Sequence, residues 1–381
     1  MYGILDYCTM VARDDVRKNS YLRALRGVIT PASVVIDLGA GIGLFALAAA
    51  KMGARHVYAI EENPSSELGP ELAKAAGVAD RVTFLQASAW DLQLPEPASV
   101  LFYDLRGTLP LYQDNFALVA HAKSSWLAPG GVHFPLRDVL RAAVVHAPGC
   151  YGKLLGAAAA VRDLGLPDDA VKRCLMNTRM SDRDTPIAAE HVLSESMAWA
   201  TLEYGAPAPR SVNGKAELVV VRPGLAHGIA VWFETELAPD IRYDTAPGRE
   251  PTYSRAFLPF TEPTQLAMGD RVTVELRAMI DGVEWGWSLG VTRKDGTTLR
   301  SAKQTTMLAG LRPMATMLGD APSSTPSRNA RGERALKILS AMDGTTSNLE
   351  LRGMLGTPDE NAGATERAIA EVAALVRRYG R

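Results

Sequence analysis

The chain has 381 residues, of which 47% are hydrophobic and 22% charged, and its formal net charge is −1. This composition is ordinary for a folded globular protein, and the balanced charge argues against a general attraction to nucleic acid or to anionic membranes. Three scattered cysteines argue against a zinc cluster or a disulfide framework, and no apolar run reaches the ~18 residues of a membrane span. The first residues do not read as a signal peptide, so we expect a cytoplasmic protein of two or three domains with no nucleic-acid or membrane partner.

The first third of the chain predicts alternating strands and helices. Apolar periodicity over residues 1–30 predicts a helix that ends before Thr30-Pro31, because the residue before a proline is disfavoured in a helix. The alternation that follows predicts a mostly parallel sheet with helices on both faces. A turn at 127–131 is then expected to lead into a further strand. The predicted strands are 33–38, 56–61, 81–86 and 98–104, and the predicted helices are 42–52, 64–76 and 112–126.

The loop at 37–43 reads Asp-Leu-Gly-Ala-Gly-Ile-Gly and stands between an apolar run and an Ala/Leu-rich segment. A strand, a glycine turn and a helix in this order are typical of a nucleotide-binding α/β domain. Glycines let the backbone turn tightly and let a ligand lie against it. The next apolar run ends at Glu61, whose carboxylate can accept hydrogen bonds from both ribose hydroxyls of an adenosine. Together these features resemble the class I S-adenosylmethionine (SAM) methyltransferases.

From about residue 136 the sequence changes character. Residues 137–147 predict a strand, 151–190 two or three short helices, and 196–300 a series of closely spaced strands. Asp-Gly pairs at 281–282 and 295–296 are typical of hairpins, and such strands and turns predict a β-barrel or sandwich. The polar, Pro/Ser-rich stretch 316–333 predicts a linker, and residues 334–381 predict a small helical C-terminal appendage.

The order of these parts resembles the protein arginine methyltransferase family over roughly residues 1–300. The resemblance implies an α/β fold, with a Rossmann-like class I methyltransferase domain at 1–135 followed by a β-barrel domain at 136–315. It also implies that the helices at 151–190 are an inserted dimerisation arm, and hence that the chain forms a homodimer. The matching motifs are Tyr2-Gly3-Ile4, Val16-Arg17, the 37–43 loop, Ala59-Ile60-Glu61, Trp126-Leu127-Ala128-Pro129-Gly130-Gly131 and Ala230-Val231-Trp232-Phe233.

The acceptor motifs of that family are altered in this chain. Family members carry a Ser-Glu-x-x-Gly-Tyr loop and a second Glu some nine residues later, and the two carboxylates hold the substrate guanidinium. Here the loop reads Tyr-Asp-Leu-Arg-Gly-Thr at 103–108, the second Glu position is Gln113, and the family's Thr-His-Trp motif reads Thr-Tyr-Ser at 252–254. A substrate guanidinium would meet one carboxylate and a like charge, so we expect an acceptor other than protein arginine.

Twelve residues are candidates for cofactor binding. The 37–43 loop and Glu61 follow from the strand-loop-helix pattern, and their structural alternative is a plain strand-helix turn. By its family position Arg17 would pair with the SAM carboxylate, against the alternative of a solvated helix charge. Trp90 replaces a family acid and would stack on or wall the adenine, unless it is a core residue. The full set is Tyr2, Met10, Arg17, Asp37, Gly39, Ala40, Gly41, Gly43, Glu61, Ser88, Ala89 and Trp90.

Asp104 is the candidate catalytic residue. It ends the fourth predicted strand, at the carboxyl edge where open α/β sheets bind their ligands, and it would orient or deprotonate the acceptor. The alternative is a loop acid paired with Arg106. The candidate substrate contacts are Tyr103, Arg106, Gln113 and Tyr253.

These residues predict an N- or O-methyltransferase that uses SAM, releases S-adenosylhomocysteine and needs no metal. Displacement at a sulfonium requires mainly alignment of the nucleophile, its desolvation and, where needed, removal of a proton. The expected acceptor is a small metabolite or a peptide. One alternative is a protein arginine methyltransferase with a remodelled acceptor site, and another is a catalytically inactive SAM-binding scaffold.

Overall fold

The structure is a computed structural model that describes residues 8, 14–111, 115–204, 210–249, 253–279, 284–309, 330–347 and 350–351. It separates into two units, Met1–Arg312 and Pro313–Arg381, which are described separately. No helix in the described part of the chain combines the length and the apolar content needed to cross a bilayer.

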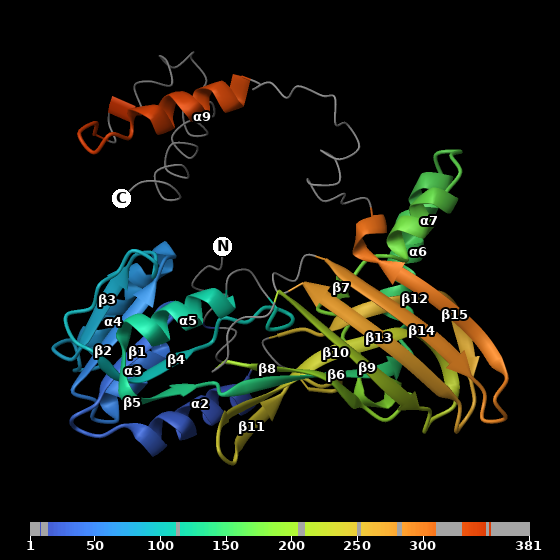
Figure 1. The fold of residues 1–381 in the computed structure, drawn as a ribbon, viewed down its shortest axis with the longest axis horizontal. Coiled ribbons are helices and arrows are strands. Elements are labelled where there is room, and N and C mark those ends of the chain that lie inside the picture. The colour runs from blue at the N-terminus through green and yellow to red at the C-terminus, as the bar shows by residue number, and fades with distance from the viewer. Residues whose placement is uncertain are drawn as a thin grey trace. The chain divides into compact units, whose positions relative to one another are not determined.

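The first unit opens with a parallel sheet of five strands in the order β3-β2-β1-β4-β5 (Figure 1). Each neighbouring pair runs parallel, and every residue of the central strand β1 is buried. Burial on both faces is typical of a parallel sheet covered by helices, and it confirms the predicted α/β class. The strands are β1 (Val34–Leu38), β2 (His56–Glu61), β3 (Val82–Gln86), β4 (Ala98–Tyr103) and β5 (Leu127–Phe134).

The α-helices that precede and connect the strands of this sheet have 7 to 14 residues. Asp14 caps the first of them, because its side chain accepts a hydrogen bond of 3.0 Å from the Arg17 amide. The turn predicted at 127–131 instead lies within β5, where the pairing with β4 jumps from Leu127 to Val132 and leaves the glycines as a bulge. The helices are α2 (Asp15–Val28), α3 (Leu44–Lys51), η1 (Pro64–Leu68), α4 (Gly69–Ala75) and α5 (Asn115–Trp126).

Two antiparallel sheets follow in the same unit, drawn from green to orange in Figure 1. One has the order β7-β12-β10-β6-β8, with β11 paired to β10, and the other has the order β15-β14-β13-β9. The strands are β6 (Arg137–Val145), β7 (Met180–Ser181), β8 (Met197–Glu203), β9 (Ser211–Val219), β10 (Gly224–Ala238), β11 (Ile241–Asp244), β12 (Ala256–Leu266), β13 (Arg271–Met279), β14 (Trp285–Thr292) and β15 (Thr298–Thr305).

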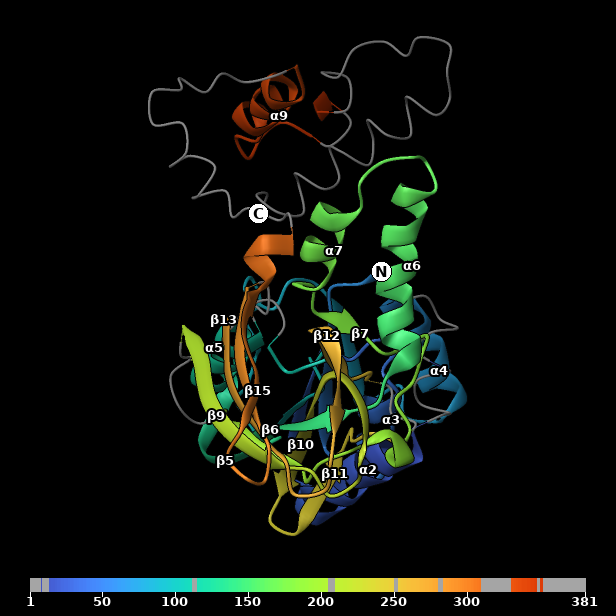
Figure 2. The same cartoon turned by 90° about the vertical axis from the view of Figure 1, so that its right-hand side faces the viewer.

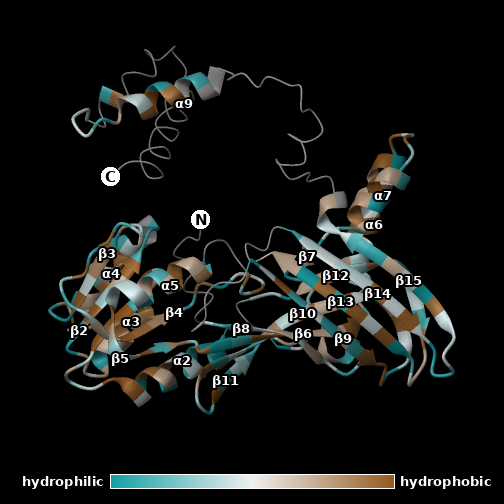
Figure 3. Cartoon of the chain, in the orientation of Figure 1, coloured by the Kyte–Doolittle hydropathy of each residue, from teal (hydrophilic) through white to brown (hydrophobic). Residues whose placement is uncertain are grey.

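The antiparallel strands alternate between core and solvent. Buried residues of β13 such as Val272, Val274 and Leu276 alternate with exposed or half-buried neighbours, which appears as alternating colour along the strand in Figure 3. Core side chains of these sheets join those of the parallel sheet in one continuous cluster. The barrel-like arrangement agrees with the predicted second half of the fold.

Two helices, α6 (Pro148–Arg162) and α7 (Asp169–Leu175), extend beyond the strand ends in both views (Figures 1 and 2). At their base, Tyr151 and Leu154 pack against Trp232 of β10 and Phe257 of β12 in a separate apolar cluster. A one-turn helix, η2 (Ala189–His191), returns the chain to β8. This segment covers the arm predicted at 151–190.

The first unit ends at η3 (Thr306–Ala309), and α9 (Ala330–Ala341) is the described helix of the second. The helix begins four residues before the predicted start of the appendage at 334, and of these four Ala330, Arg331 and Glu333 are good helix formers while Gly332 is not. The hairpin predicted at 281–282 and the later helical residues lie outside the described part of the chain.

Candidate active site

The glycine loop joins β1 to α3 and has positive φ angles, which residues with a side chain rarely adopt. Gly39, Gly41 and Gly43 have φ values of 78°, 58° and 81°. A Cβ on Gly39 would lie 2.2 Å from Leu105 Cδ2, and one on Gly43 would lie 2.4 Å from Phe84 Cε1. Glycine is therefore required here both for the backbone and for the space.

Glu61 ends β2 and lies across this loop. Its Oε2 accepts a hydrogen bond of 2.8 Å from the Gly41 amide, and its Oε1 accepts one of 2.8 Å from the Asn63 amide. The side chain is half-buried, and a carboxylate has about four lone-pair positions, so it keeps acceptor capacity for hydroxyl groups. The predicted pairing of the loop with a strand-end acid is thus present in the structure.

Asp37, near the end of β1, is a second acidic group beside the loop. It is 4% exposed, and its Oδ2 has no hydrogen-bond partner among the described residues. Burial raises the pKa of Asp37 well above its usual value, and the nearby carboxylates of Glu61 and Asp104 add to this effect. A glycine cradle with an orphaned buried carboxyl oxygen and two further acids fits a cofactor that carries a ribose, an ammonium group and a sulfonium.

The remaining cofactor candidates are spread around this cradle. The Ala40 amide donates to the Ile60 carbonyl at 3.0 Å, which fixes the loop against β2. Ser88 and Ala89 follow β3, and Trp90 is 47% exposed with its ring tilted against His121 of α5 at a centroid distance of 5.0 Å. Trp90 is therefore a surface residue rather than a core one. The candidates Tyr2, Met10 and Gln113 lie outside the described residues.

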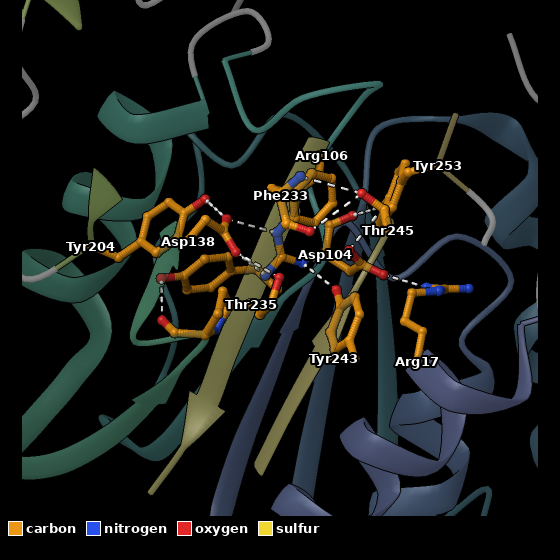
Figure 4. Close-up of polar contacts among 12 residues, drawn as sticks. Arg17, Asp104, Arg106, Asp138, Tyr204, Phe233, Thr235, Tyr243, Thr245 and Tyr253 are labelled. Carbon is orange, nitrogen blue, oxygen red and sulfur yellow. Dashed lines mark hydrogen bonds and ion pairs between the residues drawn. The ribbon is translucent and has the colours of Figure 1, made fainter. Parts of the chain in front are cut away.

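Asp104 lies directly after β4, at the centre of the cluster in Figure 4. Its Oδ1 accepts hydrogen bonds of 2.8 Å from Arg106 and 2.8 Å from the Tyr253 hydroxyl, while Arg17 forms an ion pair with its Oδ2. The pairing of Asp104 with Arg106, which was the alternative to a catalytic role, is therefore observed, and Arg17, expected at the SAM carboxylate, adds a second cation. Arg17 is 5% exposed, so it is not a solvated helix charge.

These partners hold Asp104 in its ionised form. Burial alone would raise the pKa of Asp104, but the cations of Arg17 and Arg106 and the hydrogen bonds from Tyr253 and Arg17 lower it below its usual value. Burial also raises the pKa of the Tyr253 hydroxyl well above its usual value, so Tyr253 stays a donor. The stabilisation from Asp104 is fully present above the ~3.9 of an unfolded aspartate and is lost as the pH falls through the lowered folded pKa.

Arg106 points away from solvent into a buried polar network (Figure 4). Its side chain is 1% exposed, and its Nε donates to Asp138 Oδ2 at 3.0 Å. Its Nη1 also donates to the Tyr21 and Tyr243 hydroxyls, at 2.9 Å and 3.1 Å. Arg106 was predicted to contact substrate directly, and the structure instead gives its donors internal partners.

Tyr103 is also turned into the core. It is 1% exposed, and its hydroxyl donates to the Pro135 carbonyl at 3.0 Å. The ring packs edge-on against Tyr204 at a centroid distance of 5.5 Å. Its predicted role as a substrate contact is replaced by a structural one, because the side chain at the end of a central strand faces the layer between the sheets. Tyr253 remains beside Asp104.

The acid that pairs with Arg106 was not predicted from the sequence. Asp138 on β6 is fully buried, and it accepts hydrogen bonds from Tyr204 at 2.5 Å and from Thr235 at 2.6 Å. An arginine inside the loop and an acid in a largely apolar strand were both visible in the sequence. Their pairing was not, since 32 positions separate them and Asp138 lies on β6, in a different sheet from β4.

Comparison with known proteins agrees with this geometry. A family model described as ribosomal protein L11 methyltransferase (PrmA) matches residues 19–84. Protein arginine N-methyltransferase 6 of Xenopus tropicalis is 25% identical over 281 residues, which are 68% of this chain and 79% of that protein. Two structures match the fold at 19% identity. Arabidopsis thaliana protein arginine methyltransferase 10 has a TM-score of 0.66 and covers 78% of this chain and 95% of its own. The Trypanosoma brucei PRMT1 enzyme-prozyme complex with AdoHcy has a TM-score of 0.68, with 78% and 97% covered.

The chain is a SAM-dependent methyltransferase, and its fold is similar to that of protein arginine methyltransferases. Its cofactor is SAM, and the residues that would hold it in this methyltransferase are the glycine loop, Glu61 and Asp37. SAM supplies an electrophilic methyl group on a sulfonium. The protein's own residues have to bind this group, orient the acceptor against it and exclude water.

We expect Glu61→Ala to remove the thermal stabilisation that S-adenosylhomocysteine gives the full chain. At 100 times its Kd a ligand adds about 2.7 kcal/mol to folding stability, which is readily seen as a rise in Tm. The exposed neighbour Glu62 is the matched control, and Glu62→Ala should keep the shift. A Glu61→Ala protein that is stabilised as much as the wild type would show that this carboxylate does not hold the cofactor.

Proposed function

We propose that this methyltransferase modifies an uncharged nitrogen acceptor, on a small metabolite or a peptide, and not a protein arginine. The observation that supports this most directly is the state of Asp104. Both of its carboxylate oxygens already bind guanidinium groups of the chain itself, from Arg17 and Arg106. The position that would receive a substrate guanidinium is thus already balanced by internal cations.

A cationic acceptor would be repelled at this position. Two unit charges 4 Å apart interact by about 4 kcal/mol at an effective dielectric constant of 20. Arg106 cannot turn away easily, because Asp138 and the Tyr21 and Tyr243 hydroxyls hold the rest of its guanidinium. An uncharged acceptor avoids this repulsion.

The lowered pKa of Asp104 favours nitrogen over oxygen. A general base works best when its pKa lies near the working pH, so Asp104 is a poor base for a hydroxyl group. An amine that attacks the sulfonium needs no prior loss of a proton, and positive charge develops on its nitrogen. The Asp104 carboxylate accepts three side-chain hydrogen bonds and keeps acceptor capacity for one more, so it can orient such an amine.

The names of the relatives favour one rival, a protein arginine methyltransferase with a remodelled acceptor site. The full chain would be incubated with methyl-labelled SAM and an Arg/Gly-rich peptide, and in parallel with amine-bearing small molecules and peptides that lack arginine. We expect no methylarginine in the hydrolysed Arg/Gly peptide and base-stable label on nitrogen in an amine arm. Methylarginine recovered from the peptide would overturn the proposal.

A second rival is a catalytically inactive SAM-binding scaffold. Conversion of SAM to S-adenosylhomocysteine in the presence of an acceptor fraction would exclude it.

The homodimer through 151–190 and the cytoplasmic location remain predictions within this proposal. Leu155, Leu164 and Leu166 on the arm are 42%, 77% and 55% exposed, which supports association, and sedimentation of the full chain would check it.

A further inference from the structure

The Ser254 hydroxyl connects two segments that are far apart in the sequence. It lies 3.2 Å from the Thr108 hydroxyl in the loop at 103–108, the acceptor loop, and it accepts a hydrogen bond of 2.7 Å from Ser181. Ser181 belongs to β7, at the base of the helical arm, and pairs with Ala256 at the start of β12. Ser254 is 7% exposed, so little water competes for these contacts.

A buried ion pair fixes the backbone on one side of Ser254. Arg255 Nε donates to Asp182 Oδ2 at 2.6 Å, and these side chains are only 4% and 0% exposed. The backbone amides of Arg255 and Ile187 also donate to the Asp182 carboxylate, at 2.8 Å and 3.1 Å. Arg255 Nη1 also donates to the Ala246 and Arg249 carbonyls, so this network holds residues 181–187 and 254–255 in one arrangement.

Tyr253 lies on the other side of Ser254 and contacts the acceptor site. Its hydroxyl donates to Asp104 Oδ1 at 2.8 Å, and it is also 3.1 Å from the Asp104 carbonyl oxygen. Three consecutive residues therefore contact Asp104, the acceptor loop and the base of the arm. Their backbone cannot shift without moving the Tyr253 hydroxyl relative to Asp104.

We propose that Ser254 is a positioning residue, which places the Tyr253 hydroxyl and the 104–108 loop relative to the base of the arm. This positioning role rests on the proposed function, which puts Asp104 at the acceptor. Ser254 acts through Tyr253 and Thr108 and touches no reacting atom itself. A displacement of the arm would reach the acceptor site through this connection, and small displacements matter because methyl transfer depends on alignment.

The test observes Tyr253 directly and needs no acceptor. The full chain is labelled with 3-fluorotyrosine, and the fluorine resonance of Tyr253 is assigned from its loss in Tyr253→Phe. We expect Ser254→Ala to shift or split this resonance by more than its linewidth while the Kd for S-adenosylhomocysteine stays within a few-fold of the wild type. Thr108→Val, which removes the hydroxyl at the other end, should act in the same direction, and Ser254→Thr should return the resonance towards its original position.

Ser194→Ala is the matched control. Ser194 is 3% exposed, but its hydroxyl bonds only main-chain groups of Val144 and Glu195. The proposal is overturned if Ser254→Ala leaves the Tyr253 resonance unchanged, if Ser194→Ala shifts it equally, or if Ser254→Thr behaves as Ser254→Ala does. A clear shift in Ser254→Ala together with methylarginine in the labelled-peptide assay would refute the proposed acceptor and leave the positioning role standing.

Discussion

Asp104→Asn is expected to lower the rate of methyl transfer on the order of 10²- to 10³-fold, the usual cost of removing one preorganised electrostatic contact. The amide keeps the shape of the side chain but removes one of the two carboxylate oxygens that can accept a hydrogen bond and orient the amine. It also leaves Arg17 and Arg106 without their shared anion. The measurement is single-turnover release of S-adenosylhomocysteine, with the acceptor that the labelled-SAM assay identifies.

Asp270→Asn is the matched control for this change. Asp270 is 2% exposed and accepts hydrogen bonds from the Ala267 amide, just before β13, and from the Lys294 amide, in the turn between β14 and β15. It should keep a near-normal rate per folded molecule. An Asp104→Asn enzyme within threefold of the wild-type rate would remove Asp104 from the acceptor site.

Asp138→Asn is expected to lower the free energy of unfolding by about 3–5 kcal/mol, because it leaves the Arg106 guanidinium buried without its full counter-charge. Asp138 also accepts the Tyr204 and Thr235 hydroxyls, and an amide can accept only part of this set. Urea unfolding followed by fluorescence gives the change, provided that the slope of the transition is unaltered.

Glu236→Gln tests whether burial is the cause of the stability loss expected in Asp138→Asn. Glu236 pairs with Arg137 and Arg242, whose side chains are 41% and 55% exposed. Solvent screens such pairs, so the same acid-to-amide change there should cost less than about 1 kcal/mol. Equal losses in the two variants would contradict the view that the Arg106–Asp138 pair is a demanding buried contact.

The architecture was predictable because it depends on local patterns. The β-branched run before Asp37, the glycine spacing and the acid at the end of the next strand are each set by a few adjacent residues. These residues place the carboxyl ends of β1 and β2 and the glycine loop where the sequence predicts them. The bulge in β5 was not predictable, because Pro129-Gly130-Gly131 has the composition of a turn and only pairing with β4 keeps it in a strand.

The acceptor site was predictable in its position but not in its orientations. The sequence places Asp104, Arg106 and Tyr253 near one another through the loop and the family order of motifs. It does not say that Arg106 turns inward, since that depends on Asp138 from another sheet. Likewise, the place of Tyr103 in the motif favours a substrate contact, but both faces of the end of β4 are buried, and Tyr103 lies in the core.

The Arg106–Asp138 pair also constrains how this enzyme can change its acceptor. Its two members come from the loop after β4 and from β6, so separate codons encode the two halves of one contact. A mutation that frees Asp104 by removing Arg106 leaves Asp138 as a buried, unpaired anion, and the reverse mutation leaves a buried cation. Each first step therefore loses stability before any new specificity is gained. With Asp104 at the acceptor, as proposed, we expect acceptor preference in this chain to be epistatic, so that exchanging it takes two coordinated substitutions or a strongly stabilised starting sequence.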